Sequence, residues 1–181
     1  MAVNIDEKEK YDFLYKIRSH KFPTRYNLGK DATEFIINEL KPLSIIDCGC
    51  AGNMFLKEIR YRMPGIKSIG VDFSCNHSDL ICDIKDLPFD DKEFDLSTAF
   101  DVMEHIPEDE IDLVLAEMVR VSNRFIFSIA YNEAEFKCKG RIIKFHVSVF
   151  PEEWWINKLN RYCGDVKKYG KYLYGVWSYS N

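Results

Sequence analysis

The stretch LSIIDCGCAGN, residues 43–53, decides how this chain folds. Its first five residues, 43–47, form a short apolar run that ends on an acid, which predicts a buried strand. Gly49 and Gly52 follow, and glycine lets the backbone turn tightly and approach a ligand with no Cβ in the way. Residues 53–63 form a predicted helix, which ends at the Pro-Gly pair that follows. A strand, a glycine-containing loop and a helix in this order are typical of α/β domains that bind nucleotide-like cofactors.

Strands and helices alternate along the rest of the chain. The predicted strands are residues 43–47, 68–72, 80–83, 94–100 and 124–131, and a terminal strand or hairpin lies within 165–181. The predicted helices are residues 6–19, 31–40, 53–63, 107–121 and 151–162. Such alternation implies right-handed crossovers between parallel strands. We therefore expect an α/β fold: a Rossmann-like, doubly wound, mostly parallel sheet of seven strands flanked by helices in three α-β-α layers.

The composition and charge of the chain limit which classes of protein and which binding partners are expected. The chain has 181 residues, of which 46% are hydrophobic and 30% charged, and a net charge of −4. This balance argues against a tight, sequence-independent nucleic-acid binder, although it does not exclude a local basic patch. No apolar run approaches a membrane span and the first residues lack the apolar stretch of a secretory signal, so we expect a cytoplasmic protein with no membrane partner. The six cysteines lack C-x-x-C spacing, which favours reduced thiols over a zinc site. The oligomeric state is not indicated.

Acids follow three of the predicted strands. Asp47, Asp72 and Asp83 stand at strand ends, and the carboxyl ends of parallel strands meet at one edge of the sheet. Asp72 lies 25 residues after Asp47, and its two oxygens can accept both ribose hydroxyls of an adenosine-containing cofactor. An isolated acid could simply mark the end of a strand, but three at one edge favour a binding crevice.

A second stretch points to a family. Residues 83–96, DIKDLPFDDKEFDL, lead into residues 100–107, FDVMEHIP. This segment resembles class I S-adenosylmethionine-dependent methyltransferases of the small-molecule type, in which an acid precedes an LPF turn, a strand that begins with FD and a helix start that contains EH. Together with the glycine loop, the resemblance covers about residues 43–131. It implies the fold above, an enzyme and S-adenosylmethionine as cofactor. That cofactor carries a cationic sulfonium and a cationic ammonium group and has no phosphate. An acidic rim therefore suits S-adenosylmethionine better than it suits a dinucleotide, whose pyrophosphate is negatively charged.

The resemblance also implies which residues bind the cofactor. Gly49 and Gly52 would line its methionine portion with Asp47 near the amino group, Asp72 would bind the ribose, and Asp83 with Ile84 the adenine. The remaining members of the set are Cys50, Phe73 and Phe100. The family loop has glycines two, four and six positions after the first acid, whereas this chain has Ala51 and Asn53 at the second and third of these. Alanine is tolerated there where the backbone angles are ordinary.

We expect one domain, because the chain has no repeat, low-complexity tract or Gly/Ser linker. Within residues 1–181, residues 1–42 would be a helical lead-in and residues 43–131 the cofactor-binding core. Residues 132–181 would supply a loop, a helix and terminal strands on the acceptor side.

Methyl transfer is an in-line displacement, so the enzyme chiefly positions the nucleophile and can remove its proton. The candidate catalytic residues are Asp101, His105 and His146, with Glu104 as a further base and Tyr26 and Tyr131 as orienting groups. Alternatively, Glu104 and His105 cap the following helix and pack under the rim, and His146 is a scaffold histidine. The predicted acceptor is a small molecule methylated at oxygen or nitrogen, and no metal is assigned.

Two rival functions stay open. Asp101-x-x-Glu104-His105 with His146 resembles the ligand set of metal-dependent small-RNA terminal 2′-O-methyltransferases, where a divalent ion polarises a hydroxyl. The second rival is a non-catalytic cofactor- or partner-binding subunit with the same fold, which the altered glycine loop would suit. The basic stretch 137–144 would either receive a phosphate or carboxylate or form a solvated face.

Overall fold

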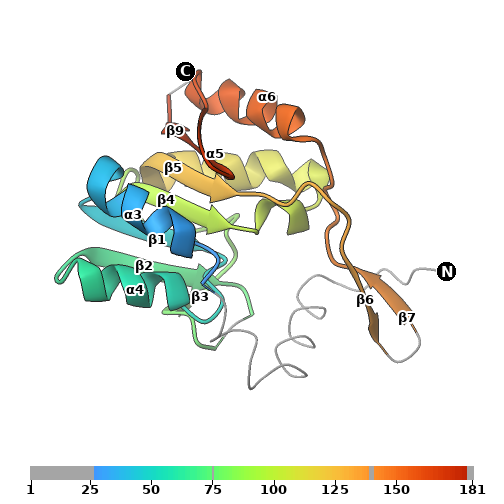
Figure 1. Cartoon of the computed structure of the whole chain (residues 1–181), viewed down its shortest axis with the longest axis horizontal. Helices are drawn as coiled ribbons and strands as arrows, with labels where there is room; N and C mark the ends of the chain where they lie inside the picture. The colour runs from blue at the N-terminus through green and yellow to red at the C-terminus, as the bar shows by residue number, and fades with distance from the viewer. Residues whose placement is uncertain (1–26, 75, 139–140, 179–181) are drawn as a thin grey trace.

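The computed structural model describes residues 27–74, 76–138 and 141–178. Its centre is a seven-stranded sheet with the strand order β3-β2-β1-β4-β5-β9-β8 (Figure 1). The strands are β1 (Ser44–Cys48), β2 (Lys67–Asp72), β3 (Leu80–Ile81), β4 (Phe94–Phe100), β5 (Ser122–Ser128), β8 (Lys167–Tyr169) and β9 (Tyr172–Val176). The first five pair in parallel, and β9 is antiparallel to both β5 and β8. The predicted mostly parallel seven-stranded sheet is confirmed.

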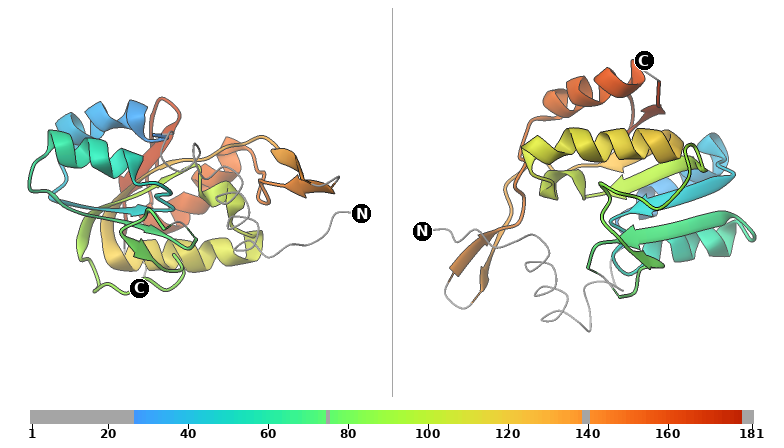
Figure 2. Two further views of the ribbon diagram at one scale, coloured as in Figure 1. Left: turned by 90° about the horizontal axis from the view of Figure 1, so that it is seen from below. Right: turned by 180° about the vertical axis from the view of Figure 1, so that it is seen from behind.

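Helices cover both faces of the sheet, so the three predicted layers are present. On one face lie the short turns η1 (Lys30–Ala32), α3 (Thr33–Phe35) and η2 (Ile36–Leu40), together with α4 (Met54–Arg62). On the other lie α5 (Ile111–Val121) and α6 (Glu152–Cys163), and Figure 2 shows α3 and α4 separated by the sheet from α5. The turns η3 (Met103–His105) and η4 (Glu108–Glu110) connect β4 to α5.

The core is divided into two apolar clusters, one on each face of the sheet. In β5, Phe125 and Phe127 belong to the cluster under α5 and α6, while Ile126 belongs to the cluster under α3 and α4. Because both faces are covered, β1 is buried along its whole length and its sequence is a continuous apolar run rather than an alternating one. Trp155 of α6 is fully buried in the first cluster, as expected for helix-to-sheet packing.

The structure differs from the sequence-based predictions most clearly at three places, and in addition the predicted strand 80–83 is shortened to β3 and the predicted helix 107–121 begins with the 3-10 turn η4. An unpredicted hairpin, β6 (Glu135–Cys138) and β7 (Arg141–Lys144), forms a separate two-stranded sheet that extends away from the main one (Figure 1). The expected strand 124–131 is shifted: β5 begins two residues earlier and ends at Ser128. The expected helix 31–40 is a series of 3-10, α and π turns, which ends where Lys41 takes a left-handed φ of 46°.

The predicted helix 6–19 and the candidate orienting residue Tyr26 lie outside the described residues. Within the described part of the chain, no helix combines the length and apolar character that crossing a bilayer requires.

Candidate active site

The strand order places the candidate site at the carboxyl ends of β1, β2 and β4. The order of strands reverses between β1 and β4, and in doubly wound sheets the ligand crevice lies at such a point. Asp47 is in β1, Asp72 ends β2, and Asp101 follows β4. The topology therefore brings together three acids that are far apart in the sequence.

The loop after β1 is a run of left-handed residues. Gly49, Ala51 and Asn53 have φ values of 72°, 45° and 60°. The loop is held in place where the backbone N–H groups of Gly49 and Cys50 donate to the Val71 carbonyl at 2.8 and 3.0 Å. The expectation that Ala51 keeps ordinary backbone angles is wrong. The chain adopts the backbone that three alternating glycines would favour, although only the first of these positions is glycine.

Substitution of Ala51 by glycine is expected to raise the free energy of unfolding by up to about 1 kcal/mol. A left-handed conformation costs a residue with a Cβ about 1–2 kcal/mol, and glycine removes this cost. The larger conformational entropy of glycine in the unfolded chain offsets part of the gain in stability. Ala116→Gly is the matched control, since Ala116 is exposed in α5, where glycine should destabilise by about 1 kcal/mol. Urea denaturation of both variants measures the two signs. Destabilisation of similar size by both would contradict a strained Ala51.

Asp72 fastens the glycine loop to the end of β2. Its side chain is 2% exposed, its Oδ2 accepts the backbone N–H of Ala51 at 3.0 Å, and its Oδ1 accepts that of Ser74 at 3.0 Å. A carboxylate can accept about four hydrogen bonds in total, so holding the loop and accepting ribose hydroxyls are compatible roles. Asp72 is therefore both a structural anchor and a candidate cofactor ligand.

Asp47 is a buried acid with a polar but uncharged partner. It is 3% exposed, and Thr98 donates its hydroxyl hydrogen to Oδ1 at 2.5 Å. Burial, together with the negative charge of the nearby Asp72, raises the pKa of Asp47 to about 7, while the Thr98 hydrogen bond and the more distant Arg60 lower it in part. Among the described lysines and arginines, none forms an ion pair with Asp47. A cationic ammonium group would supply the missing charge, which is the chemistry that S-adenosylmethionine offers. The acids at this edge thus fit that cofactor.

The other predicted cofactor residues differ in exposure. The Asp83 side chain is 55% exposed and ion-paired with Lys85 at 3.6 Å, whereas Ile84 is 8% exposed. The Phe100 ring is buried in the core, where it packs edge-on against Phe55 with a centroid separation of 4.9 Å. Ile84 thus has the burial expected of an apolar pocket wall, and the Phe100 side chain contacts the core.

Sequence reasoning missed Asn53 and Thr98 as parts of the site. Asn53 is 2% exposed, begins α4 and donates from Nδ2 to the His77 carbonyl at 3.2 Å. Asparagine tolerates the left-handed region, and its place in the glycine pattern was the available signal. Thr98 gave no signal, because its contact with Asp47 depends on the register of β1 and β4.

Asp101, the first residue after β4, has a strained backbone conformation. Its φ is 54°, its backbone N–H donates to the Ser128 carbonyl at 2.9 Å, and Ser128 Oγ donates to its Oδ1 at 2.6 Å. Non-glycine residues held at positive φ cost about 1–3 kcal/mol and cluster at functional sites. The end of β5 therefore fixes the direction of the Asp101 carboxylate.

Glu104 and Tyr131 are two further candidate residues. Glu104 is fully buried, burial raises its pKa to about 8 against the effect of the nearby backbone N–H groups of Glu104 and Ala130, and neither carboxylate oxygen has a hydrogen-bond partner of normal geometry. Of the alternative reading, in which Glu104 and His105 cap the following helix and pack under the rim, the burial of Glu104 fits the packing, but the Glu104 carboxylate does not cap η4 or α5. Tyr131 donates to Glu152 at 3.4 Å, and burial raises its pKa to about 12, so it acts as a neutral phenol.

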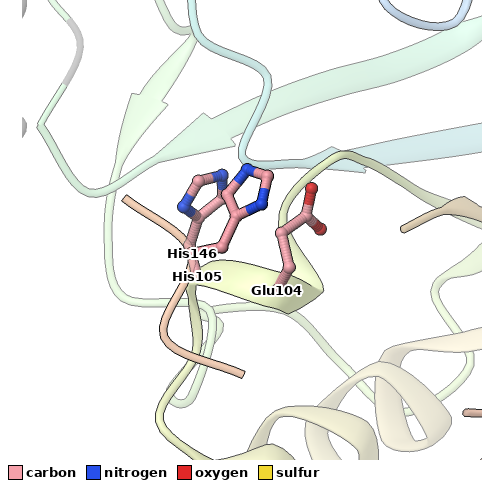
Figure 3. A group of neighbouring side chains, drawn as sticks. All are labelled: Glu104, His105 and His146. Atoms are coloured by element: carbon pink, nitrogen blue, oxygen red, sulfur yellow. The ribbon is translucent and has the colours of Figure 1, made fainter. Parts of the chain in front are cut away.

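Two histidines distant in sequence meet beside Glu104. The His105 and His146 ring centroids are 4.9 Å apart, and Figure 3 shows both imidazoles next to the Glu104 carboxylate. His105 Nδ1 bonds to the Phe145 carbonyl at 2.7 Å, and His146 Nδ1 to the Asn132 carbonyl at 2.6 Å. Two of the three predicted catalytic residues are therefore neighbours.

Solved structures share this architecture. The chain is similar to a protein of Pyrococcus horikoshii OT3, with a TM-score of 0.65, 18% identity and coverage of 91% of this chain and 96% of that one. A 1,6-didemethyltoxoflavin-N1-methyltransferase of Burkholderia thailandensis has a TM-score of 0.64 and 13% identity, with coverage of 99% and 94%. A SAM-dependent methyltransferase of Aquifex aeolicus has a TM-score of 0.58 and 18% identity, with coverage of 96% and 98%. At these identities the likeness shows the fold.

The sequence itself matches a known domain family. Residues 46–124 match the methyltransferase domain family. The matched segment runs from β1 to the start of β5. No curated protein matches the chain. The matched residues contain the glycine loop, Asp47, Asp72 and Asp101, and the sheet around them has the class I order. The match covers 79 of the 181 residues, and together with the strand order it supports a methyltransferase of the class I fold that uses S-adenosylmethionine as its cofactor.

Proposed function

We propose that the protein transfers the methyl group of S-adenosylmethionine to an oxygen or nitrogen of a small-molecule acceptor. Asp101 carries this proposal, because a half-buried carboxylate held at a φ of 54° beside the cofactor edge is placed at an energetic cost. Its Oδ1 is fixed by Ser128, which leaves a directed carboxylate that would accept the acceptor's proton or orient its hydroxyl or amine.

The edge described above would hold the cofactor. Asp47 would face its ammonium group, Asp72 would accept its ribose hydroxyls, and the backbone around Gly49 would lie along its methionine portion. When bound, the cofactor supplies an electrophilic methyl group on a sulfonium sulfur. Within the chain, Ser128 and Thr98 keep the acids Asp101 and Asp47 in fixed orientations, so the residues would need little rearrangement during transfer.

A small acceptor is supported by a solved neighbour of similar architecture. The similar Burkholderia thailandensis N1-methyltransferase was solved with bound 1,6-didemethyltoxoflavin and S-adenosylhomocysteine, and 94% of that chain is covered. Beyond the main sheet, the described residues add one hairpin, β6–β7. This methyltransferase is therefore a precedent for a small-molecule acceptor on the same fold.

Replacement of Asp101 by asparagine is expected to lower kcat about 100-fold or more and to leave cofactor affinity within about twofold. General-base assistance contributes about 10²–10⁴-fold, and asparagine keeps the shape without the basicity. The assay follows methyl-labelled S-adenosylmethionine with a panel of phenols, carboxylic acids, amines and nitrogen heterocycles, and a small RNA as a separate arm. Calorimetry on the same variant measures cofactor affinity.

Asp109→Asn is the matched control, because Asp109 is exposed on η4. Label on a small molecule, lost in the Asp101 variant alone, supports the proposal. Label on the RNA arm only would favour the RNA 2′-O-methyltransferase instead. Cofactor binding without label in any arm would favour a non-catalytic subunit.

A further inference from the structure

A buried carboxylate without a cationic or side-chain hydrogen-bond partner lies against two imidazoles. Glu104, His105 and His146 each offer one ligand atom, and these three atoms lie within 4.8 Å of one another (Figure 3). Glu104 is 0% exposed, and neither of its oxygens has a hydrogen-bond partner of normal geometry; the backbone N–H groups of Glu104 and Ala130 lie close enough to lower its pKa, but they do not neutralise its charge. Leaving a buried carboxylate unsatisfied is costly, and such groups in native proteins are usually paired or coordinate a metal.

The backbone holds the two segments of this cluster together. The N–H groups of Val147 and Ser148 both donate to the Glu104 carbonyl, at 2.9 and 3.0 Å, and Ser148 Oγ donates to the Ile106 carbonyl at 2.5 Å. The loop that carries His146 is thereby fastened to the η3 turn that carries Glu104 and His105. The backbone therefore holds the two segments of the cluster side by side.

The hydrogen bonds of the histidines select one tautomer. His105 Nδ1 and His146 Nδ1 each bond to a backbone carbonyl, at 2.7 and 2.6 Å. A carbonyl oxygen only accepts, so both Nδ1 atoms carry the proton and the lone pair of each neutral ring is on Nε2. An Nδ1–H held by a backbone carbonyl is the usual support of a metal-ligating histidine, because it fixes the ring and raises the basicity of the other nitrogen.

We propose that Glu104, His105 and His146 bind one divalent transition-metal ion of the Zn²⁺ type. Two imidazoles and one carboxylate suit Zn²⁺ and its neighbours better than Mg²⁺ or Ca²⁺, which prefer oxygen ligands throughout. Asp101 is not a member of the group, so the site has three protein ligands and one open position. Sites of this kind bind water or a substrate atom in the open position.

The ligand atoms must move slightly to bind the ion. Zn²⁺–N and Zn²⁺–O bonds of about 2.0–2.2 Å put tetrahedral ligand atoms about 3.3–3.5 Å apart, closer than the 4.8 Å limit of the group. His146 is half-exposed in a loop, so a small shift of this loop that keeps the hydrogen bond between Nδ1 and the Asn132 carbonyl can close the gap while Glu104 stays in place. The inference is independent of the proposed acceptor, because metal binding is measured without one.

The test is direct titration of metal into the full chain. After treatment with a chelator and its removal, Zn²⁺ is added in the calorimeter, and Co²⁺ is added in parallel so that visible absorption reports nitrogen and oxygen coordination. Mg²⁺ forms a separate arm. The variants are Glu104→Gln, which keeps the shape of the side chain, and His146→Ala, which alters a half-exposed loop residue. His77→Ala is the matched control, because His77 is exposed and outside the cluster.

The expected result is one equivalent of Zn²⁺, bound at least about 100-fold more weakly by Glu104→Gln and His146→Ala and unchanged by His77→Ala. The Co²⁺ spectrum should be lost in the same two variants. Zn²⁺ binding that persists in both of these variants would place the ion elsewhere, on the cysteines for example, and overturn the proposal. So would the absence of Zn²⁺ binding, or a preference of the same residues for Mg²⁺.

Discussion

Replacement of Asp72 by alanine is expected to weaken S-adenosylmethionine binding by about 100-fold or more. Two interactions are lost together: the carboxylate that would accept the ribose hydroxyls, and the two backbone N–H bonds that hold Ala51 and Ser74. Hydrogen bonds to a charged group contribute about 1.5–3 kcal/mol each, and each 1.4 kcal/mol is tenfold in affinity. Isothermal titration calorimetry with S-adenosylmethionine and S-adenosylhomocysteine measures the loss.

The control for this variant is Asp109→Ala, which removes an exposed carboxylate from η4. Circular dichroism and thermal melting establish that both variants keep the fold. A folded Asp72→Ala protein that binds the cofactor within about twofold of the wild type would show that Asp72 holds only the loop.

Replacement of Asp47 by asparagine is expected to abolish the pH dependence of cofactor binding. Burial raises the pKa of Asp47 to about 7, against about 3.9 for an exposed aspartate. An ammonium group beside it favours the ionised form, so wild-type affinity should rise by up to about tenfold per pH unit from pH 5 to 7 and then level off. The asparagine variant stays neutral, and its affinity should be weak and constant over this range.

Asp47→Asn, which weakens cofactor binding, should raise the free energy of unfolding above about pH 7. The folded wild type keeps the Asp47 proton between about pH 4 and 7, where the unfolded chain has lost it. The free energy of unfolding therefore falls as pH rises through this window, by on the order of 4 kcal/mol, and the cost is fully present above about pH 7. At pH 8, Asp47→Asn should melt above the wild type while binding the cofactor more weakly. A lower melting temperature together with unchanged binding would contradict the assignment.

The sheet was predictable because its strands carry local signals. Residues 94–100 and the run before Asp47 are buried on both faces, so continuous apolar sequence marks them and their ends carry the acids. The β6–β7 hairpin has no comparable signal, since Glu135, Lys137 and Arg141 are polar and the hairpin does not join the main sheet.

The site was predictable in its types of residue and only partly in its arrangement. The loop pattern identified Gly49 but not the left-handed backbone of Ala51, because alanine gives no sign of the conformation that its neighbours impose. The contact of His146 with Glu104 and His105 depends on two backbone bonds from Val147 and Ser148 across more than 40 residues. Side-chain chemistry can be deduced from the sequence, whereas such long-range contacts require the fold.

Calorimetric titration of S-adenosylmethionine, S-adenosylhomocysteine and NAD into the wild-type chain tests the central claim most directly. The claim is that the acids at the ends of β1 and β2 form a site for a cofactor that carries an ammonium and a sulfonium and no phosphate. The account predicts binding of the first two ligands in the micromolar range, and none of NAD. Binding of NAD instead, or of neither methionine-derived ligand at millimolar concentration, would contradict it.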